Sequence, residues 1–169
     1  MRDATTSSPA LRDAGAILSR TAEDEAAALE ARERYRDRGM EPMEPDARIA
    51  ELLVPGEDVL AVRRSALLDR REPPIGGGRG PGCLGMAGDL YVTSNRIVHL
   101  GRTVLEYDYT TICEAVVSAE HLLLILRDGT GVTIDVPQPR LLRVEIAAAR
   151  ARQAARAGAA WDSGAADPR

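Results

Sequence analysis

The fold is decided by the stretch from residue 88 to residue 136, GDLYVTSNRIVHLGRTVLEYDYTTICEAVVSAEHLLLILRDGTGVTIDV. Short runs rich in branched and aromatic residues alternate there with turn residues, a pattern typical of antiparallel strands joined by tight turns. The pair Asp128-Gly129 is a strong hairpin signal, because both residue types accept the backbone angles of a two-residue turn. The spacing predicts six strands, at residues 89–93, 96–100, 103–109, 112–117, 121–126 and 132–136.

A seventh strand is expected before this stretch. Residues 57–68, EDVLAVRRSALL, are apolar and branched enough for a strand, although a helix is an open alternative. The segment that follows, RREPPIGGGRGPGCLGMAG at residues 70–88, contains too much proline and glycine for a regular element and predicts a long loop.

A helix is expected after the strands. Pro137 and Pro139 end the sheet, and a broad apolar arc follows on one side of a helical repeat. Glu145 lies inside that arc and does not match it. The arc is formed by Leu141, Leu142, Val144, Ile146, Ala148 and Ala149.

The N-terminal segment predicts a long helical arm. Ser8 and Pro9 form a start signal and Gly39 a stop signal. The apolar face of this arm is thin and rich in alanine, so the helix either docks on another surface or remains a partly disordered arm. Prolines in residues 40–46 predict a linker. We expect three parts: a helical arm and linker at 1–44, a domain at 45–157 and a disordered tail at 158–169.

The central strands resemble a known family. The segments LLVPGEDVLAV, GDLYVTSNRIVHLG and VLEYDYTTICEAV are similar to bacterial pleckstrin-homology-like (PH-like) and GRAM-like domains. The most specific piece is LYVTSNRIVHL, with Leu90, Tyr91, Val92, Thr93 and Arg96 at the positions of a family hairpin motif. The resemblance implies a mainly β fold with α: a seven-stranded bent barrel capped by a C-terminal helix. It also implies binding of lipids or proteins rather than catalysis.

Composition argues against several classes of function. The chain has no lysine, which removes Walker phosphate loops and lysine-based catalysis. The two histidines and two cysteines lack the spacing of a zinc site. The string GPGCLG at residues 80–85 matches a dinucleotide fingerprint by letter, but a strand follows it where a helix is needed. We therefore expect no enzyme, no cofactor and no metal.

Charge and aromatic content argue against nucleic acid as a partner. The net charge is −4, and two acidic blocks alternate with two mildly basic ones. Aromatic residues for base stacking are scarce. No apolar run approaches the length of a membrane span, and the polar start lacks the order of a signal peptide. We expect a cytoplasmic protein, with the inner face of the membrane as the alternative location.

Two candidate binding sites remain. Arginines on and after the first strand could hold an anionic ligand or lipid headgroup, since guanidinium groups donate paired hydrogen bonds to phosphate. The second candidate is the apolar face of the N-terminal arm, with Leu11, Leu18 and Leu29, which could contact a protein partner or a second copy. The leading hypothesis is a protein-binding adaptor or scaffold, and the alternative is a peripheral membrane module. The basic cluster comprises Arg63, Arg64, Arg70, Arg71 and Arg79.

Overall fold

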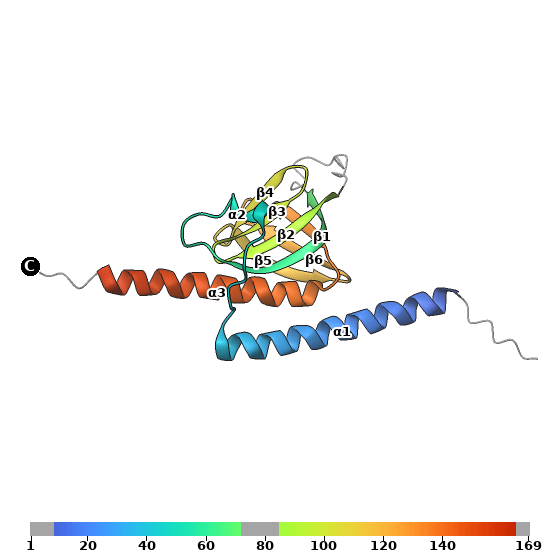
Figure 1. Ribbon diagram of the computed structural model, residues 1–169. Helices are drawn as coiled ribbons and strands as arrows, with labels where there is room; N and C mark the ends of the chain where they lie inside the picture. Colours follow the sequence, from blue (N-terminus) through green and yellow to red (C-terminus); the bar gives the residue numbers. More distant parts are fainter. Residues whose placement is uncertain (1–8, 72–84, 165–169) are drawn as a thin grey trace, which may run out of the picture.

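The computed structural model describes residues 9–71 and 85–164, without the side chains of residues 9–15, 70–71 and 160–164. Over these residues the chain is mainly β with α, as expected, and its seven strands form one antiparallel sheet between helical segments (Figure 1). The elements are α1 (Pro9–Arg38), α2 (Ala47–Ala50), β1 (Val59–Arg71), β2 (Met86–Thr93), β3 (Arg96–Leu100), β4 (Val104–Asp108), β5 (Ile112–Ser118), β6 (His121–Leu126), β7 (Gly131–Asp135) and α3 (Pro139–Gly164).

Strand β1 joins the two halves of the sheet. The strand order is β4-β3-β2-β1-β7-β6-β5, so β1 pairs with β2 on one side and with β7 on the other. The register of β1 against β2 shifts between Arg63 and Ala66, and Ser65 there has a φ of 57°. Such a bulge bends a strand and increases its twist. The first strand is therefore a strand and not a helix, and it continues to Arg71 because its end pairs with β7.

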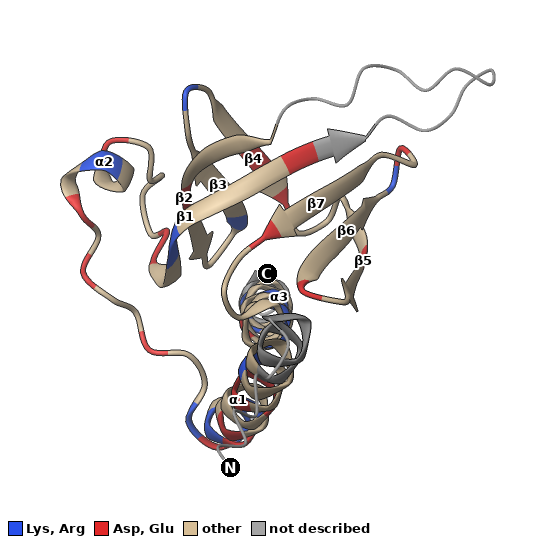
Figure 2. Cartoon of the chain, turned by 90° about the vertical axis from the view of Figure 1, so that its right-hand side faces the viewer, with Lys and Arg blue, Asp and Glu red and all other residues tan. Residues whose placement is uncertain are grey.

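Both halves of the bent sheet share one core with α3. Side chains from the inner faces of all seven strands contribute to this core, and Leu142, Ile146 and Ala149 of α3 close it. Viewed along α3, the two halves lie on either side of the opening that the helix covers (Figure 2). Of the apolar arc expected on the last helix, Leu142, Ile146, Ala148 and Ala149 thus face the core, whereas Leu141 and Val144 pack against α1.

The segment between α1 and β1 covers the outer face of β1, β2 and β3. Ile49 of α2 is fully buried against Tyr91, Val98 and Leu100. Asp46 caps α2 by accepting hydrogen bonds from the amides of residues 48 and 49. Residues 45–58 therefore pack as part of the sheet's outer layer.

Helices α1 and α3 run side by side in the same direction, displaced along their axes (Figure 1). The N-terminal half of α1 and the C-terminal end of α3 extend past the sheet at opposite ends. Helix α3 continues to Gly164, so the disordered tail expected from residue 158 is wrong for residues 158–164. Residues 148–157, which directly precede this stretch, are alanine and arginine apart from Gln153; both residue types favour helix, and no proline follows before residue 168.

Close backbone approach explains why β2 begins earlier than expected, at Met86 rather than residue 89. A Cβ atom on Gly88 would lie 2.5 Å from the carbonyl oxygen of Leu100. Glycine at this position permits a close contact between β2 and the end of β3. Glycine usually indicates a loop, but Gly88 permits β2 to pair with its neighbouring strands.

Candidate functional site

The predicted partner-binding leucines lie on α1, and the two that the structure describes are exposed. Leu18 is 70% exposed and Leu29 is 56% exposed, while the side chain of Leu11 lies outside the described residues. Ala22 and Ala26 between them are also exposed. These four residues, which we call the outer stripe, follow the helical repeat along one side of α1.

Helix α1 docks on α3 through a different face. Ala28 and Ala31 are buried against Val144, with Tyr35 packed beside them. Alanine has a short side chain, so it lets the two helix backbones approach closely. The expected face of the arm and the face that docks are therefore distinct, and the sequence pattern identified the one that stays exposed.

A buried carboxylate on α1 fixes the position of the two helices. Asp24 is 2% exposed, and its two oxygens accept hydrogen bonds from the amides of Arg140 (2.9 Å) and Leu141 (3.0 Å). These amides belong to the first turn of α3, which has no acidic residue of its own. Asp24 thus caps α3 from another helix. Sequence reasoning missed Asp24, although the proline-rich start of α3 lacks a good capping residue and so predicts one from elsewhere.

An open groove lies beside this docked pair, between α1, α3 and β5. Its volume is about 440 Å³. Three arginines and one glutamate contribute charge to its lining, and three apolar side chains complete it. Leu29 belongs both to the groove and to the outer stripe. The lining residues are Glu25, Ala28, Leu29, Arg32, Val117, Arg140 and Arg143.

The charges in the groove are unevenly paired. Arg140 pairs with Glu25, with 3.3 Å between Nε and Oε1, and lies 3.6 Å from Asp24. Arg32 and Arg143 form no ion pair or side-chain hydrogen bond with any described residue. Two guanidinium groups, one from each helix, therefore remain available in the groove. Sequence reasoning did not single out either arginine.

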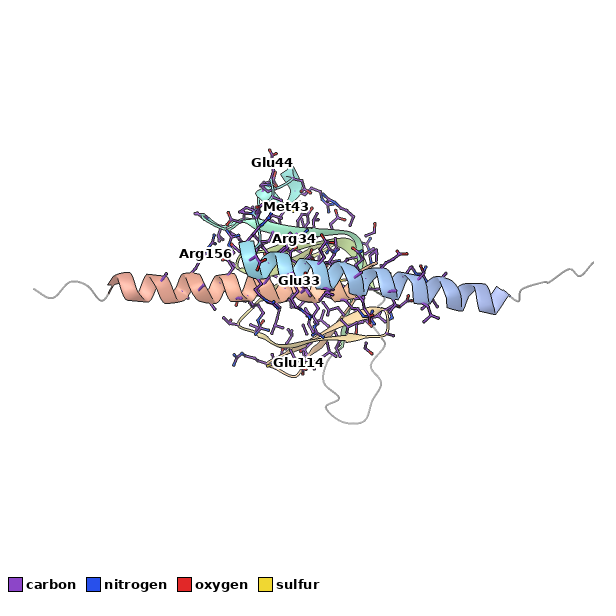
Figure 3. All side chains as sticks on the ribbon, turned by 90° about the horizontal axis from the view of Figure 1, so that it is seen from below. Glu33, Arg34, Met43, Glu44, Glu114 and Arg156 are labelled. Atoms are coloured by element: carbon purple, nitrogen blue, oxygen red, sulfur yellow. The ribbon has the colours of Figure 1, made fainter. Side chains whose placement is uncertain are left out.

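Figure 3 shows this surface from the helical side. Helix α1 runs along α3 on the side away from the sheet, and Glu33 and Arg34 lie on α1. Arg34 pairs with Glu30 at 3.9 Å and stacks on the ring of Tyr35. The charge of Arg34 is therefore already paired within α1, unlike the charges of Arg32 and Arg143.

The predicted basic cluster is placed differently from the sequence expectation. Arg63 points to α3 and forms a 2.6 Å ion pair with Glu145, whose side chain is 6% exposed. Burial raises the pKa of Glu145, and the positive charge of Arg63 opposes this rise. Glu145 is the residue that did not match the apolar arc, and Arg63 explains its presence there.

Arg64 is engaged on the opposite side of the sheet. Its guanidinium group bonds Asp46 and Asp89, both at 2.7 Å, and stacks on the ring of Tyr91. The Tyr91 hydroxyl donates to Asp46 at 2.7 Å. Hydrogen bonds from Tyr91 and then Arg64 lower the pKa of Asp46 to about 2. This cluster fastens the α2 segment to the sheet.

The remaining arginines do not complete a described anion site. Arg70 and Arg71 lie in β1, opposite Val132 and Gly131 of β7, with side chains outside the described residues. Arg79 lies outside the described residues altogether, as does most of the GPGCLG string. Among the described side chains, the cluster therefore contributes two arginines that serve internal ion pairs.

The hairpin motif that carried the family resemblance has a structural role. Thr93 donates to a buried oxygen of Glu57 at 2.6 Å, and Arg96 bonds the same carboxylate at 3.1 Å. Arg96 also pairs with Glu106 at 2.8 Å. Tyr109 donates to the backbone carbonyl of Thr93 at 2.7 Å. These contacts hold the turn between β2 and β3, and sequence reasoning missed Glu57 as their centre.

The described residues contain no cluster of histidine, cysteine and acidic groups that could hold a metal. His99 is buried in β3, and burial lowers its pKa. His121 is exposed in β6, and Cys113 is an exposed free thiol in β5. Within residues 9–71 and 85–164, none of the helices combines the length and the apolar character that a membrane-spanning helix requires.

Comparison with known proteins leaves the family open. No protein-family model matches the chain, and no curated protein matches it. Among solved structures, one similar chain is the C-terminal domain of an unknown protein from Leishmania infantum. It is 14% identical, the match covers 62% of this chain and 89% of that chain, and the TM-score is 0.39.

Proposed function

We propose that this chain is a non-enzymatic interaction module of PH-like type, an adaptor that binds a protein partner through the outer stripe of α1. One observation carries the proposal. Helix α1 docks on α3 with Ala28 and Ala31, yet Leu18 and Leu29 remain 70% and 56% exposed. Burying one leucine contributes about 1.5–3 kcal/mol, so these two side chains offer the largest apolar gain on the helix to another surface.

The spacing of the outer-stripe residues along α1 suits contact with a protein surface. Leu18 and Leu29 are eleven residues apart, which corresponds to about 16 Å along the helix axis. Exposed alanines lie between them, so a partner can approach the helix closely. Amphipathic helices bind grooves and partner helices through apolar residues at such spacings. Because Asp24 fixes α1 on α3, the stripe is presented in one orientation.

The test compares two substitutions that introduce the same charge. Leu18→Glu places a carboxylate in the outer stripe, whereas Ser19→Glu places it one residue further on an exposed part of α1. The full chain is used as bait in its native cells, with chemical crosslinking and quantitative mass spectrometry. We expect a partner that wild type and Ser19→Glu retain and Leu18→Glu loses at least tenfold. Equal recovery with both variants would refute the role of the stripe.

The alternative function is attachment to anionic membrane through the basic loop. It is less well supported, because Arg63 and Arg64 already pair with Glu145, Asp46 and Asp89. Each remaining basic group near an anionic surface would contribute about 1 kcal/mol. Flotation with anionic and neutral vesicles at near-physiological salt tests this function directly, and binding to anionic vesicles alone would favour it.

A further inference from the structure

We infer that the groove between α1, α3 and β5 binds an acidic, partly apolar segment of a protein partner, with carboxylates between Arg32 and Arg143. This inference rests on the proposed function and names the chemistry of the partner. It also extends the contact from the outer stripe into the groove, because Leu29 belongs to both.

The charge of the groove supports an acidic occupant. Three arginines and one glutamate line it, which gives a local charge of +2 on a chain whose net charge is −4. Arg140 is paired with Glu25 and Asp24. Arg32 and Arg143 have no partner among the described residues, so the positive charge is concentrated on them. Guanidinium groups bind carboxylates through two parallel hydrogen bonds.

The apolar part of the lining selects a peptide over other anions. Ala28, Leu29 and Val117 provide a surface that an aliphatic side chain can cover. None of the described residues that line the groove is aromatic, so they offer a nucleic acid no stacking surface. The two free arginines come from different helices, so a segment that contacts both must cross the seam between α1 and α3.

The groove is built with fixed geometry. Asp24 binds the first turn of α3 with hydrogen bonds of 2.9 and 3.0 Å. Arg32 lies two turns after Asp24 on α1, and Arg143 lies one turn after Arg140 on α3. The cap therefore sets the distance between the two unpaired guanidinium groups. A preformed site of this kind loses less entropy on binding.

The test uses synthetic peptides of twelve residues and the full chain. Each peptide carries two glutamates and two leucines at systematically varied spacings, and a matched set carries glutamine in place of glutamate. Binding is followed by NMR, with the side-chain Nε–Hε signals of the arginines and the methyl signals of Leu29 and Val117 as reporters. The variant Arg143→Glu is compared with Arg102→Glu, which makes the same charge change in the exposed turn between β3 and β4. Arg143→Gln serves as a milder second variant, and thermal melting confirms that each is folded.

We expect at least one acidic peptide to shift the signals of Arg32, Arg143, Leu29 and Val117. Its affinity should fall at least tenfold in Arg143→Glu, fall less in Arg143→Gln and remain unchanged in Arg102→Glu. Higher salt should weaken it, since exposed charges are screened. No binding by any acidic peptide, equal binding by the glutamine set, or equal loss in Arg102→Glu would each overturn the inference.

Failure here is distinguishable from failure of the proposed function. Leu18 does not line the groove, so the Leu18→Glu test reports on the outer stripe alone. A partner lost in Leu18→Glu but retained in Arg143→Glu would support the adaptor and overturn the acidic groove. A second copy of the chain as occupant would instead appear as self-association that Arg143→Glu abolishes, and that result would also overturn the peptide inference.

Discussion

Removing the Asp24 carboxylate should weaken the docking of α1 on α3 without unfolding the sheet. In Asp24→Ala, the amides of Arg140 and Leu141 lose the acceptor that they contact at 2.9 and 3.0 Å. Loss of a helix cap costs about 0.5–2 kcal/mol, and hydrogen bonds to a charged group contribute about 1.5–3 kcal/mol. Because Asp24 is 2% exposed, water replaces these bonds only after the helices separate. We therefore expect Asp24→Ala to weaken the docking of α1 on α3 by about 2 kcal/mol.

Hydrogen exchange measures this change locally. A loss of about 2 kcal/mol raises the population of the undocked state about 30-fold, since each 1.4 kcal/mol is a factor of ten. Amide protection should therefore fall about 30-fold in α1 from residue 24 onward and in the first turn of α3. The strands should keep most of their protection, because α1 packs mainly on α3 through Ala28 and Ala31, and Tyr35 is its described residue that reaches the sheet core.

The neighbouring carboxylate provides a matched control. Glu25 is 64% exposed, and among the described residues its ion pair is with Arg140, at 3.3 Å. An exposed ion pair contributes about 0–1 kcal/mol, so Glu25→Ala should lower protection by a small factor. Asp24→Asn should recover part of the loss, because asparagine caps helices nearly as well as aspartate. Equal effects of Asp24→Ala and Glu25→Ala would refute the reasoning, as would a uniform loss of protection that includes the sheet.

Three further predictions concern the sheet. Arg63→Met leaves the buried Glu145 carboxylate uncompensated and should lower the free energy of unfolding by about 3 kcal/mol at pH 7 in urea titrations. Because burial raises the pKa of Glu145 in the folded state, that variant should regain stability as the pH falls from 7 to 5, and no such recovery would contradict the assignment. The carboxyl of Asp46 should titrate near pH 2 by NMR. Its contribution to stability is therefore present above its ordinary pKa and is lost as the pH falls toward 2. Tyr91→Phe should raise the midpoint of this titration, because it removes the hydrogen bond that lowers the pKa most. Gly88→Ala should cost about 1–3 kcal/mol, because its Cβ would lie 2.5 Å from a β3 carbonyl oxygen, and an unchanged melting temperature would contradict that contact.

Most strands of this chain were predictable because their signals are local. The alternation of apolar and polar residues that indicates a strand spans only a few residues. The signal for the turn between β6 and β7 is equally short. The first strand was harder, because a short apolar run without clear alternation is compatible with helix or strand. Pairing with β2 and β7, which lie far along the chain, decided it.

The candidate site was predictable only in part. The thin apolar face of α1 was visible in the sequence as Leu18 and Leu29, and both are exposed. The face that docks was not visible, because Ala28 and Ala31 carry little hydrophobic signal. Close helix approach gives them their role.

Sequence determined that this chain has strands, where they turn, and that two helices flank them, since propensity, proline and glycine act on neighbouring residues. Tertiary structure alone decided which charges are available. Arg63 is neutralised by a glutamate 82 residues away, and the cap on α3 comes from an aspartate 116 residues before it. Arg32 and Arg143 face one groove because that cap and the packing of Ala28 and Ala31 on Val144 align their helices. Pairing of charges depends on distance in space, which residue spacing along the chain does not fix.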